Sequence, residues 1–120
     1  MPDTVYNESE IAQRLAELPG WRFEGGVISR EYKTDGWATT LMLVNAIGFF
    51  AEAADHHPDL AVSWARVKVS LSTHSAGGVT DKDLALARQI EQTALWRVPR
   101  GGPLRGITRE WIRGSDAEPA

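Results

Sequence analysis

The sequence predicts a single α+β domain in which helices pack on one face of a four-stranded antiparallel sheet. Three segments have apolar residues at helical spacing, and two pairs of short strand-like segments are joined by tight turns. These elements follow the order α-β-β-α-β-β-α. A chain of 120 residues can bury one core but not two. We therefore expect one domain over residues 1–96, followed by an arm over residues 97–120.

The first helix is expected to begin after Asn7, because Asn7 and Glu10 have the spacing of a capping box. A Pro-Gly pair then ends it. Residues 21–34 contain two strand-like runs on either side of a Gly-Gly pair, which predicts a β-hairpin.

Residues 37–54 form the longest apolar stretch of the chain and have helical spacing. A helix with so little polar surface is normally buried on more than one side. We expect this helix to pack on the sheet and also to face a neighbouring subunit, so that the protein forms a homo-oligomer.

The next pair of strands is predicted at residues 60–64 and 66–73, with the reversal near Ala65. In the second strand, apolar and polar residues alternate with the period of two that indicates one buried face. Thr80 and Asp83 then have the spacing that caps the start of a further helix.

Composition excludes several classes of protein and of site. The net charge of −3 and pI of about 5.6 argue against nucleic acid as the main ligand. Without cysteine, there are no disulfides, thiolate metal sites or cysteine nucleophiles. We see no apolar run long enough to span a membrane and no apolar leader at the N-terminus. The expectation is a cytoplasmic protein that binds neither membrane nor nucleic acid.

The arm differs from the rest of the chain in charge and composition. Residues 97–120 carry five arginines and three acids, net +2, whereas residues 1–96 carry eight bases and thirteen acids, net −5. Proline and glycine predict an irregular path, although Leu104, Ile107 and Trp111 could form a short amphipathic turn. We expect the arm to pack on its own or a sister subunit; the alternative is a tail that recruits a protein partner.

The three histidines of the chain, His56, His57 and His74, fall within one window of 19 residues. A single histidine is usually a surface or core residue, but this clustering favours acid–base chemistry near neutral pH. A metal site is less favoured, because adjacent histidines chelate poorly. Pro58 ends the preceding helix. Successive side chains of a strand point to opposite faces of the sheet, so His74 is expected on the face opposite Val67, Val69 and Leu71. The helix before His56 packs on that apolar face, so His56 and His74 can meet only at the rim of the sheet, where the strand ends.

A set of residues at fixed spacings resembles the signature of the pterin-4a-carbinolamine dehydratases: Glu52, His56, His57, Pro58, Trp64, His74 and Asp83. The phrases DHHPDL and VKVSLSTHSAGGVTDKD are similar to that family almost throughout. The resemblance covers roughly residues 8–95.

The resemblance implies dehydration of 4a-hydroxytetrahydropterin to quinonoid dihydropterin, a step of tetrahydropterin recycling, with pterin as the substrate. His56 and His74 would form the acid–base pair, and His57 would orient the pterin or, as a third catalytic residue, share in the proton transfer. The resemblance implies no metal and no organic cofactor. It also implies a homodimer or homotetramer.

The other matching residues have supporting roles. Glu52, four residues before His56, is expected to lie beside that imidazole and to favour its protonated form. Asp83 would either cap its helix or contact the ligand. Thr73 could donate a hydrogen bond to the pterin, and Trp64 would belong to the core or form a substrate platform.

The resemblance also leaves a non-catalytic alternative. Some members of the family bind protein partners, as dimerisation factors for a transcription factor or as assembly factors for Rubisco. The complete set of histidines favours catalysis, whereas the arm, which compact members lack, leaves protein binding open.

Overall fold

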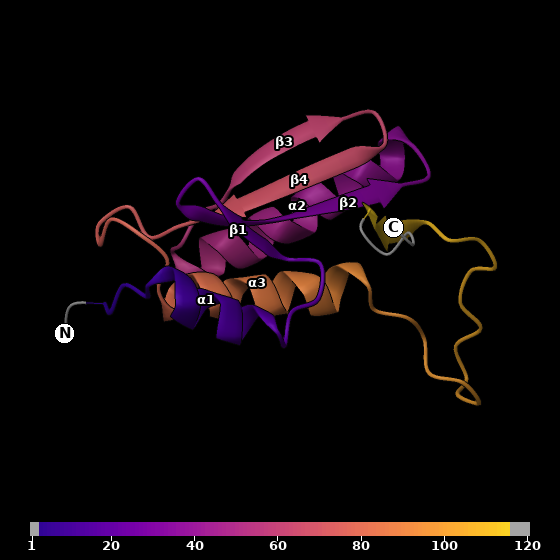
Figure 1. Ribbon diagram of the computed structural model, residues 1–120. Helices are drawn as coiled ribbons and strands as arrows, with labels where there is room; N and C mark the ends of the chain where they lie inside the picture. The colour runs from indigo at the N-terminus through magenta and orange to yellow at the C-terminus, as the bar shows by residue number, and fades with distance from the viewer. Residues whose placement is uncertain (1–2, 116–120) are drawn as a thin grey trace.

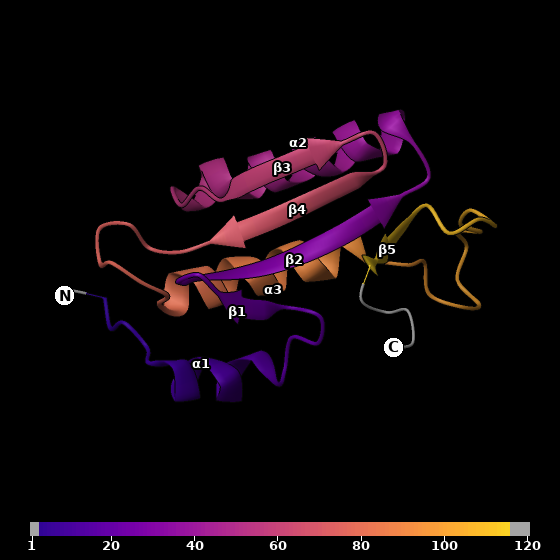
Figure 2. The ribbon, with the colours of Figure 1, turned by 45° about the horizontal axis from the view of Figure 1, so that its top comes forward.

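The three helices lie on one face of the sheet in the computed structural model, which describes residues 3–115 (Figure 1). Figure 2 shows the strands running antiparallel across them. The elements follow the predicted order, with one strand added at the end: α1 (Glu8–Leu15), β1 (Arg22–Glu24), β2 (Val27–Thr34), α2 (Trp37–Ala54), β3 (Asp59–Ser63), β4 (Arg66–Leu71), α3 (Asp81–Ala94) and β5 (Ile112–Gly114).

Local signals set the start of α1 and the first turn, as predicted. The side chain of Asn7 accepts a hydrogen bond from the backbone N–H of Glu10 at 2.8 Å, and Glu10 accepts from the N–H of Asn7 at 2.9 Å. Between β1 and β2, Gly25 and Gly26 have φ values of 63° and 81°. A two-residue hairpin turn favours this left-handed geometry, and glycine adopts it without a steric penalty.

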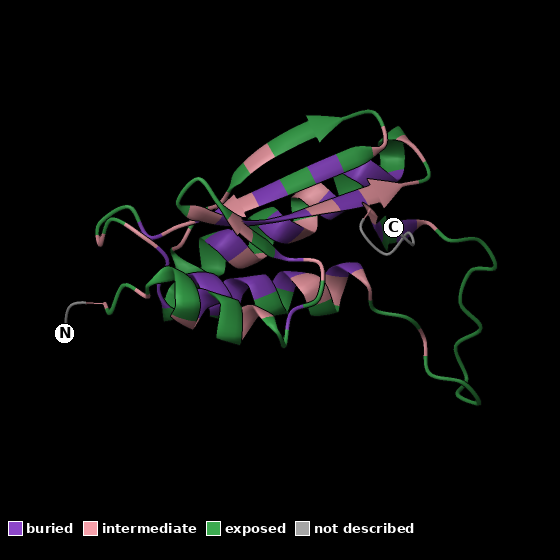
Figure 3. Cartoon of the chain, viewed as in Figure 1, coloured by how far each residue is buried: buried purple, intermediate pink, exposed green. Residues whose placement is uncertain are grey.

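The sheet has the strand order β1-β2-β4-β3, with its apolar face against the helices. The register places Ile28 opposite Leu71 and Tyr32 opposite Val67, and all four side chains are fully buried. Figure 3 shows the resulting alternation of buried and exposed residues along β4. Burying each large apolar side chain of this kind contributes about 1.5–3 kcal/mol.

The sheet contains five strands, not the predicted four. β5 pairs antiparallel with the end of β2, so that Ile112 lies opposite Thr34 and Gly114 opposite Tyr32. β1 covers only residues 27–29 of the same edge, and β5 pairs backbone groups that would otherwise be left open. A strand of three residues is too short for its period to be recognised in the sequence.

The predicted amphipathic turn of the arm does not form. Leu104 and Ile107 are 61% and 49% exposed, whereas Trp111 packs against the core, so these side chains share no buried face. Residues 116–120 of the predicted arm lie outside the described residues.

Helix α2 buries one face and exposes another. Leu43, Ile47 and Ala51 lie in the core at 1–3% exposure. Large apolar side chains on its other faces remain exposed: Trp37, Leu41, Met42 and Phe49. No apolar run long enough to span a membrane was expected, but α2 reaches that limit by length and composition, with a mean hydropathy of 1.3 over its 18 residues. The core helix of a globular domain passes the same test.

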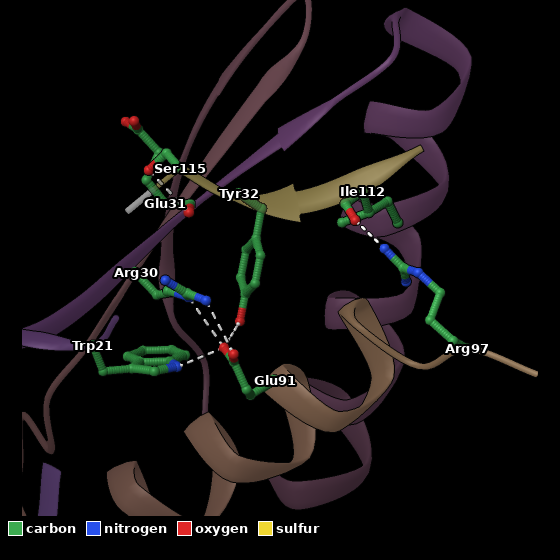
Figure 4. A network of polar contacts seen from close by, with 8 residues as sticks. All are labelled: Trp21, Arg30, Glu31, Tyr32, Glu91, Arg97, Ile112 and Ser115. Carbon is green, nitrogen blue, oxygen red and sulfur yellow. Dashed lines mark hydrogen bonds and ion pairs between the residues drawn. The ribbon is translucent and has the colours of Figure 1, made fainter. Parts of the chain in front are cut away.

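A buried polar network joins α3 to the sheet (Figure 4). The carboxylate of Glu91 accepts hydrogen bonds from Trp21 at 3.0 Å, from Arg30 at 3.1 Å and from the Tyr32 hydroxyl at 2.6 Å. Burial raises the pKa of Tyr32, and the negative charge of Glu91 raises it further. Because α3 also carries Asp83 in its first turn, this network helps to fix the position of Asp83.

Candidate functional site

The end of α2 directs the two adjacent histidines out of the helix. Asp55 has the left-handed geometry φ 51°, ψ 44°, and the N–H of His56 donates to the carbonyl of Ala51 at 3.0 Å. This arrangement ends the helix at Ala54, three residues before His57. His56 and His57 therefore lie in the short segment that leads through Pro58 into β3.

His56 contacts a buried carboxylate. Its Nε2 lies 2.6 Å from Oδ1 of Asp83, which is fully buried at the start of α3. The other oxygen, Oδ2, accepts hydrogen bonds from the Thr73 hydroxyl at 2.8 Å and from the backbone N–H of Thr80 at 2.9 Å. Asp83 therefore caps α3, which was one of the two alternatives drawn from the sequence, and it also binds His56, a contact that the sequence did not predict.

The hydrogen bonds of this network determine which groups are donors. Thr73 donates its single hydroxyl hydrogen to Asp83, so the Thr80 hydroxyl, 2.7 Å away, must donate to Thr73. An ionised Asp83 can only accept, which requires a hydrogen on Nε2 of His56. Within residues 3–115, Nδ1 of His56 has no hydrogen-bond partner. This nitrogen is therefore the one available to exchange a proton with a ligand.

Thr73 does not have the role expected for it. The side chain is 3% exposed, and its hydroxyl hydrogen is directed to Asp83. It is therefore not available as a donor to a pterin. Its contribution is to hold Asp83 in place.

Glu52 pairs with His57, and the expected contact with His56 is wrong. The Glu52 carboxylate lies 2.8 Å from Nε2 of His57, and the two side chains are 83% and 57% exposed. The helical spacing to His56 does not apply, because the helix ends at Ala54 and the turn directs His56 towards α3. An exposed pair of this kind contributes at most about 1 kcal/mol.

His74 lies at the rim where β4 has ended. Thr73 forms an isolated bridge with Gly78, and the N–H of Gly77 donates to the carbonyls of Thr73 and His74 at 2.9 and 3.2 Å. His74 is exposed while its neighbour Thr73 is buried. His74 is thus connected to His56 through Thr73 and Asp83, which agrees with the rim location expected from strand parity.

Trp64 lies at the far end of the domain from the histidines. It occupies the turn between β3 and β4, is 68% exposed, and packs beside Gly36 at the start of α2. His56 follows the other end of α2, and a helix of 18 residues is about 27 Å long. Within one chain, Trp64 is therefore not part of the site, and it does not belong to the core.

A hollow of about 550 Å³ opens between the end of α2 and the start of α3 beside His56. It is lined mainly by apolar side chains and two charged ones: Phe50, Ala53, Ala54, Asp55, His56, Lys82, Ala85, Leu86 and Gln89. Sequence reasoning had missed Lys82, although it lies inside the predicted cap between Thr80 and Asp83. Across residues 3–115, no group of three or more His, Asp or Glu side chains is placed to hold a metal ion.

Residues 4–93 match the sequence model of the family described as pterin 4 alpha carbinolamine dehydratase. A relative from Aquifex aeolicus is 48% identical over 86 residues, covering 72% of this chain and 87% of the relative. One from Streptomyces avermitilis is 43% identical over 95 residues, covering 78% and 94%. Both bear the provisional name pterin-4-alpha-carbinolamine dehydratase.

Two solved structures are similar in fold. A Brucella melitensis protein, described as a transcriptional coactivator/pterin dehydratase, has a TM-score of 0.69 and 35% identity, covering 72% of this chain and 95% of its own. A pterin dehydratase-like protein, described as a RuBisCO assembly factor in the alpha-carboxysome, has a TM-score of 0.56 and 18% identity. It covers 63% of this chain and 90% of its own, and at this identity the likeness concerns the fold alone.

Proposed function

Since the chain belongs to the pterin-4-alpha-carbinolamine dehydratase family, we propose that it dehydrates a 4a-hydroxytetrahydropterin by histidine acid–base catalysis. Family membership supports carbinolamine dehydratase activity at the general level. The product would be quinonoid dihydropterin, and the reaction would be a step of tetrahydropterin recycling.

The reaction needs one acid and one base. The bond between C4a and its hydroxyl oxygen breaks, and the oxygen takes a proton so that it leaves as water. A ring nitrogen loses a proton to a base while the C=N bond forms. A positioned acid or base of this kind typically accelerates the reaction by about 10²–10⁴-fold.

The observation that carries the proposal is the contact between His56 and the buried carboxylate of Asp83. A carboxylate that holds one ring nitrogen fixes the tautomer and the orientation of a histidine, and it stabilises the imidazolium that forms when the ring takes a proton. His56 would then exchange a proton through Nδ1. His74 would supply the second proton-transfer group from the same rim, and His57, oriented by Glu52, would position the pterin.

A non-catalytic role in protein binding is the second candidate. It is favoured by the exposed apolar side chains of α2 and by an arm that begins beyond the family match at residue 93. In that case the histidines would be a structural remnant, and replacing them would leave the function unchanged.

The test is dehydration of chemically generated 4a-hydroxytetrahydropterin, followed by absorbance, with purified wild type, His74→Ala and His57→Ala. We expect the wild-type rate of dehydration to exceed the rate in buffer. The kcat/KM of His74→Ala should be about 10²-fold lower than that of wild type, because a proton-transfer group is lost. His57→Ala should mainly raise KM. A wild-type rate equal to that of buffer would exclude the proposal and favour the binding role.

A further inference from the structure

The arm places a basic surface on an acidic protein. It leaves the end of α3, runs as a long exposed loop beside the domain and returns to the sheet at β5 (Figures 1 and 3). Residues 97–115 carry five arginines and one glutamate, whereas residues 1–96 have a net charge of −5. The family match ends at residue 93, so the shared pterin chemistry does not account for this segment.

The loop is tied to the domain at its base. The guanidinium of Arg97 donates to the backbone carbonyl of Ile112, as Figure 4 shows. Arg109 forms an ion pair with Asp35. A hydrogen bond from Thr39, together with Arg109, holds the pKa of Asp35 below its usual range. Asp35 therefore remains charged at neutral pH, and its ion pair with Arg109 persists.

The loop encloses a hollow of its own, about 380 Å³ in volume. The lining combines indole, aliphatic and guanidinium groups: Trp96, Arg97, Val98, Arg105, Gly106, Ile107, Arg109 and Trp111. Gly106 has a φ of +75°, and a Cβ there would lie 2.7 Å from Cγ2 of Val98. The two limbs of the loop therefore pack closely only because this residue is glycine, which defines the shape of the hollow.

Two arginines of the loop remain available for a partner. Arg97 and Arg109 are engaged in the contacts that tie the loop down, but Arg100 and Arg105 are exposed and have no hydrogen bond or ion pair within residues 3–115. Ile107, which lines the hollow together with Arg105, has a side chain that is half exposed, at 49%. Arginine beside exposed apolar and indole groups is the composition typical of protein-binding hot spots.

We propose that the arm site, formed by Trp96, Arg105 and Ile107 at the hollow, with Arg100 exposed on the same loop, docks an acidic peptide segment that carries a bulky apolar side chain. The apolar side chain enters the hollow, and carboxylates of the segment pair with Arg100 and Arg105. A nucleic acid is less suited, because Arg100 and Arg105 are the arm arginines without a hydrogen bond or ion pair within residues 3–115, and the net charge of the protein is −3.

The test is fluorescence anisotropy with the full chain and a fluorescein-labelled peptide of about a dozen Asp and Glu residues around one Leu-Phe pair, at physiological salt. We expect saturable binding that Arg105→Glu weakens about tenfold and Ile107→Ser weakens several-fold. Arg88→Glu, the same charge change on the exposed surface of α3, should leave the affinity within about twofold. Circular dichroism checks that each variant is folded.

A pair of glycine variants tests whether the hollow itself matters. Gly106 and Gly101 have φ values of +75° and +79°, but a Cβ at Gly101 would meet nothing within 4 Å. Both alanine variants therefore carry similar backbone strain, and only Gly106→Ala also disturbs the packing against Val98. We expect Gly106→Ala to weaken peptide binding and Gly101→Ala to leave it nearly unchanged.

Each of the following results with the peptide would overturn the proposal: no saturation up to about 1 mM peptide, arm variants that bind like wild type, equal losses in the two glycine variants, or equal affinity for a peptide without the Leu-Phe pair. Tighter binding of single-stranded DNA than of the peptide would also overturn it, since it would indicate a general polyanion surface.

Discussion

At the scale of residues, the site depends on the buried carboxylate of Asp83 and not on the exposed one of Glu52. Asp83 is fully buried and receives hydrogens from His56, Thr73 and the backbone of Thr80. Buried carboxylates with several donors hold their partners in one geometry, whereas exposed pairs exchange freely with water. The Thr80 hydroxyl donates to Thr73, and Thr73 donates to the Asp83 carboxylate that holds His56. Thr80 is therefore a positioning residue for His56.

Thr80 provides a test of this order. Thr80→Val removes the hydroxyl that donates to Thr73, and we expect kcat for dehydration to fall about tenfold with KM nearly unchanged. Thr80→Ser keeps the hydroxyl and should restore kcat. If valine and serine give the same kcat, the hydroxyl does not act on the site. The loss of the helix cap, about 1 kcal/mol, is measured separately by unfolding.

At the scale of elements, α3 links the core to the site. Its first turn carries Asp83, and two turns later Glu91 receives hydrogen bonds from Trp21, Arg30 and Tyr32. Arg30 is 5% exposed and forms an ion pair with Glu91 at 3.1 Å. Removing one partner of a largely buried ion pair is costly, because the hydrogen bonds between the charged groups are lost.

Glu91→Gln is therefore expected to lower the free energy of unfolding by about 3 kcal/mol. Chemical denaturation followed by tryptophan fluorescence measures it. Glu17→Gln, an exposed acid just after α1, is the matched control and should change stability by less than about 0.5 kcal/mol. Equal effects in the two variants would show that the network does not stabilise the fold.

At the scale of the whole molecule, elements with local signals could be predicted from the sequence. Asn7 and Glu10 encode a cap, the Gly-Gly pair encodes a turn, and alternation identifies the buried face of β4. What could not be predicted depends on contacts between distant segments. His56 and Asp83 are 27 residues apart, and Trp21 and Glu91 are 70 apart. Likewise, β5 is a strand only because an open edge of β2 is available to it.

The exposed side of α2 predicts how the molecule assembles. Met42 and Phe49 are 53% and 69% exposed and lie two helical turns apart on α2, so they form one exposed apolar face of the kind that marks protein-binding surfaces. We propose a homodimer or homotetramer that covers it. Phe49→Glu should reduce the mass measured by light scattering, whereas Glu8→Gln on exposed α1 should not. A monomeric wild type at micromolar concentration would contradict this expectation.

The most direct test of the central claim is a double-mutant cycle on the dehydration rate, with wild type, His56→Ala, Asp83→Asn and the double variant. If Asp83 acts through His56, each single variant loses about 10²-fold of kcat/KM, and the double variant loses no more than His56→Ala alone. Losses that multiply, or an Asp83→Asn variant with the wild-type rate, would show that the buried carboxylate does not prepare His56 for proton transfer.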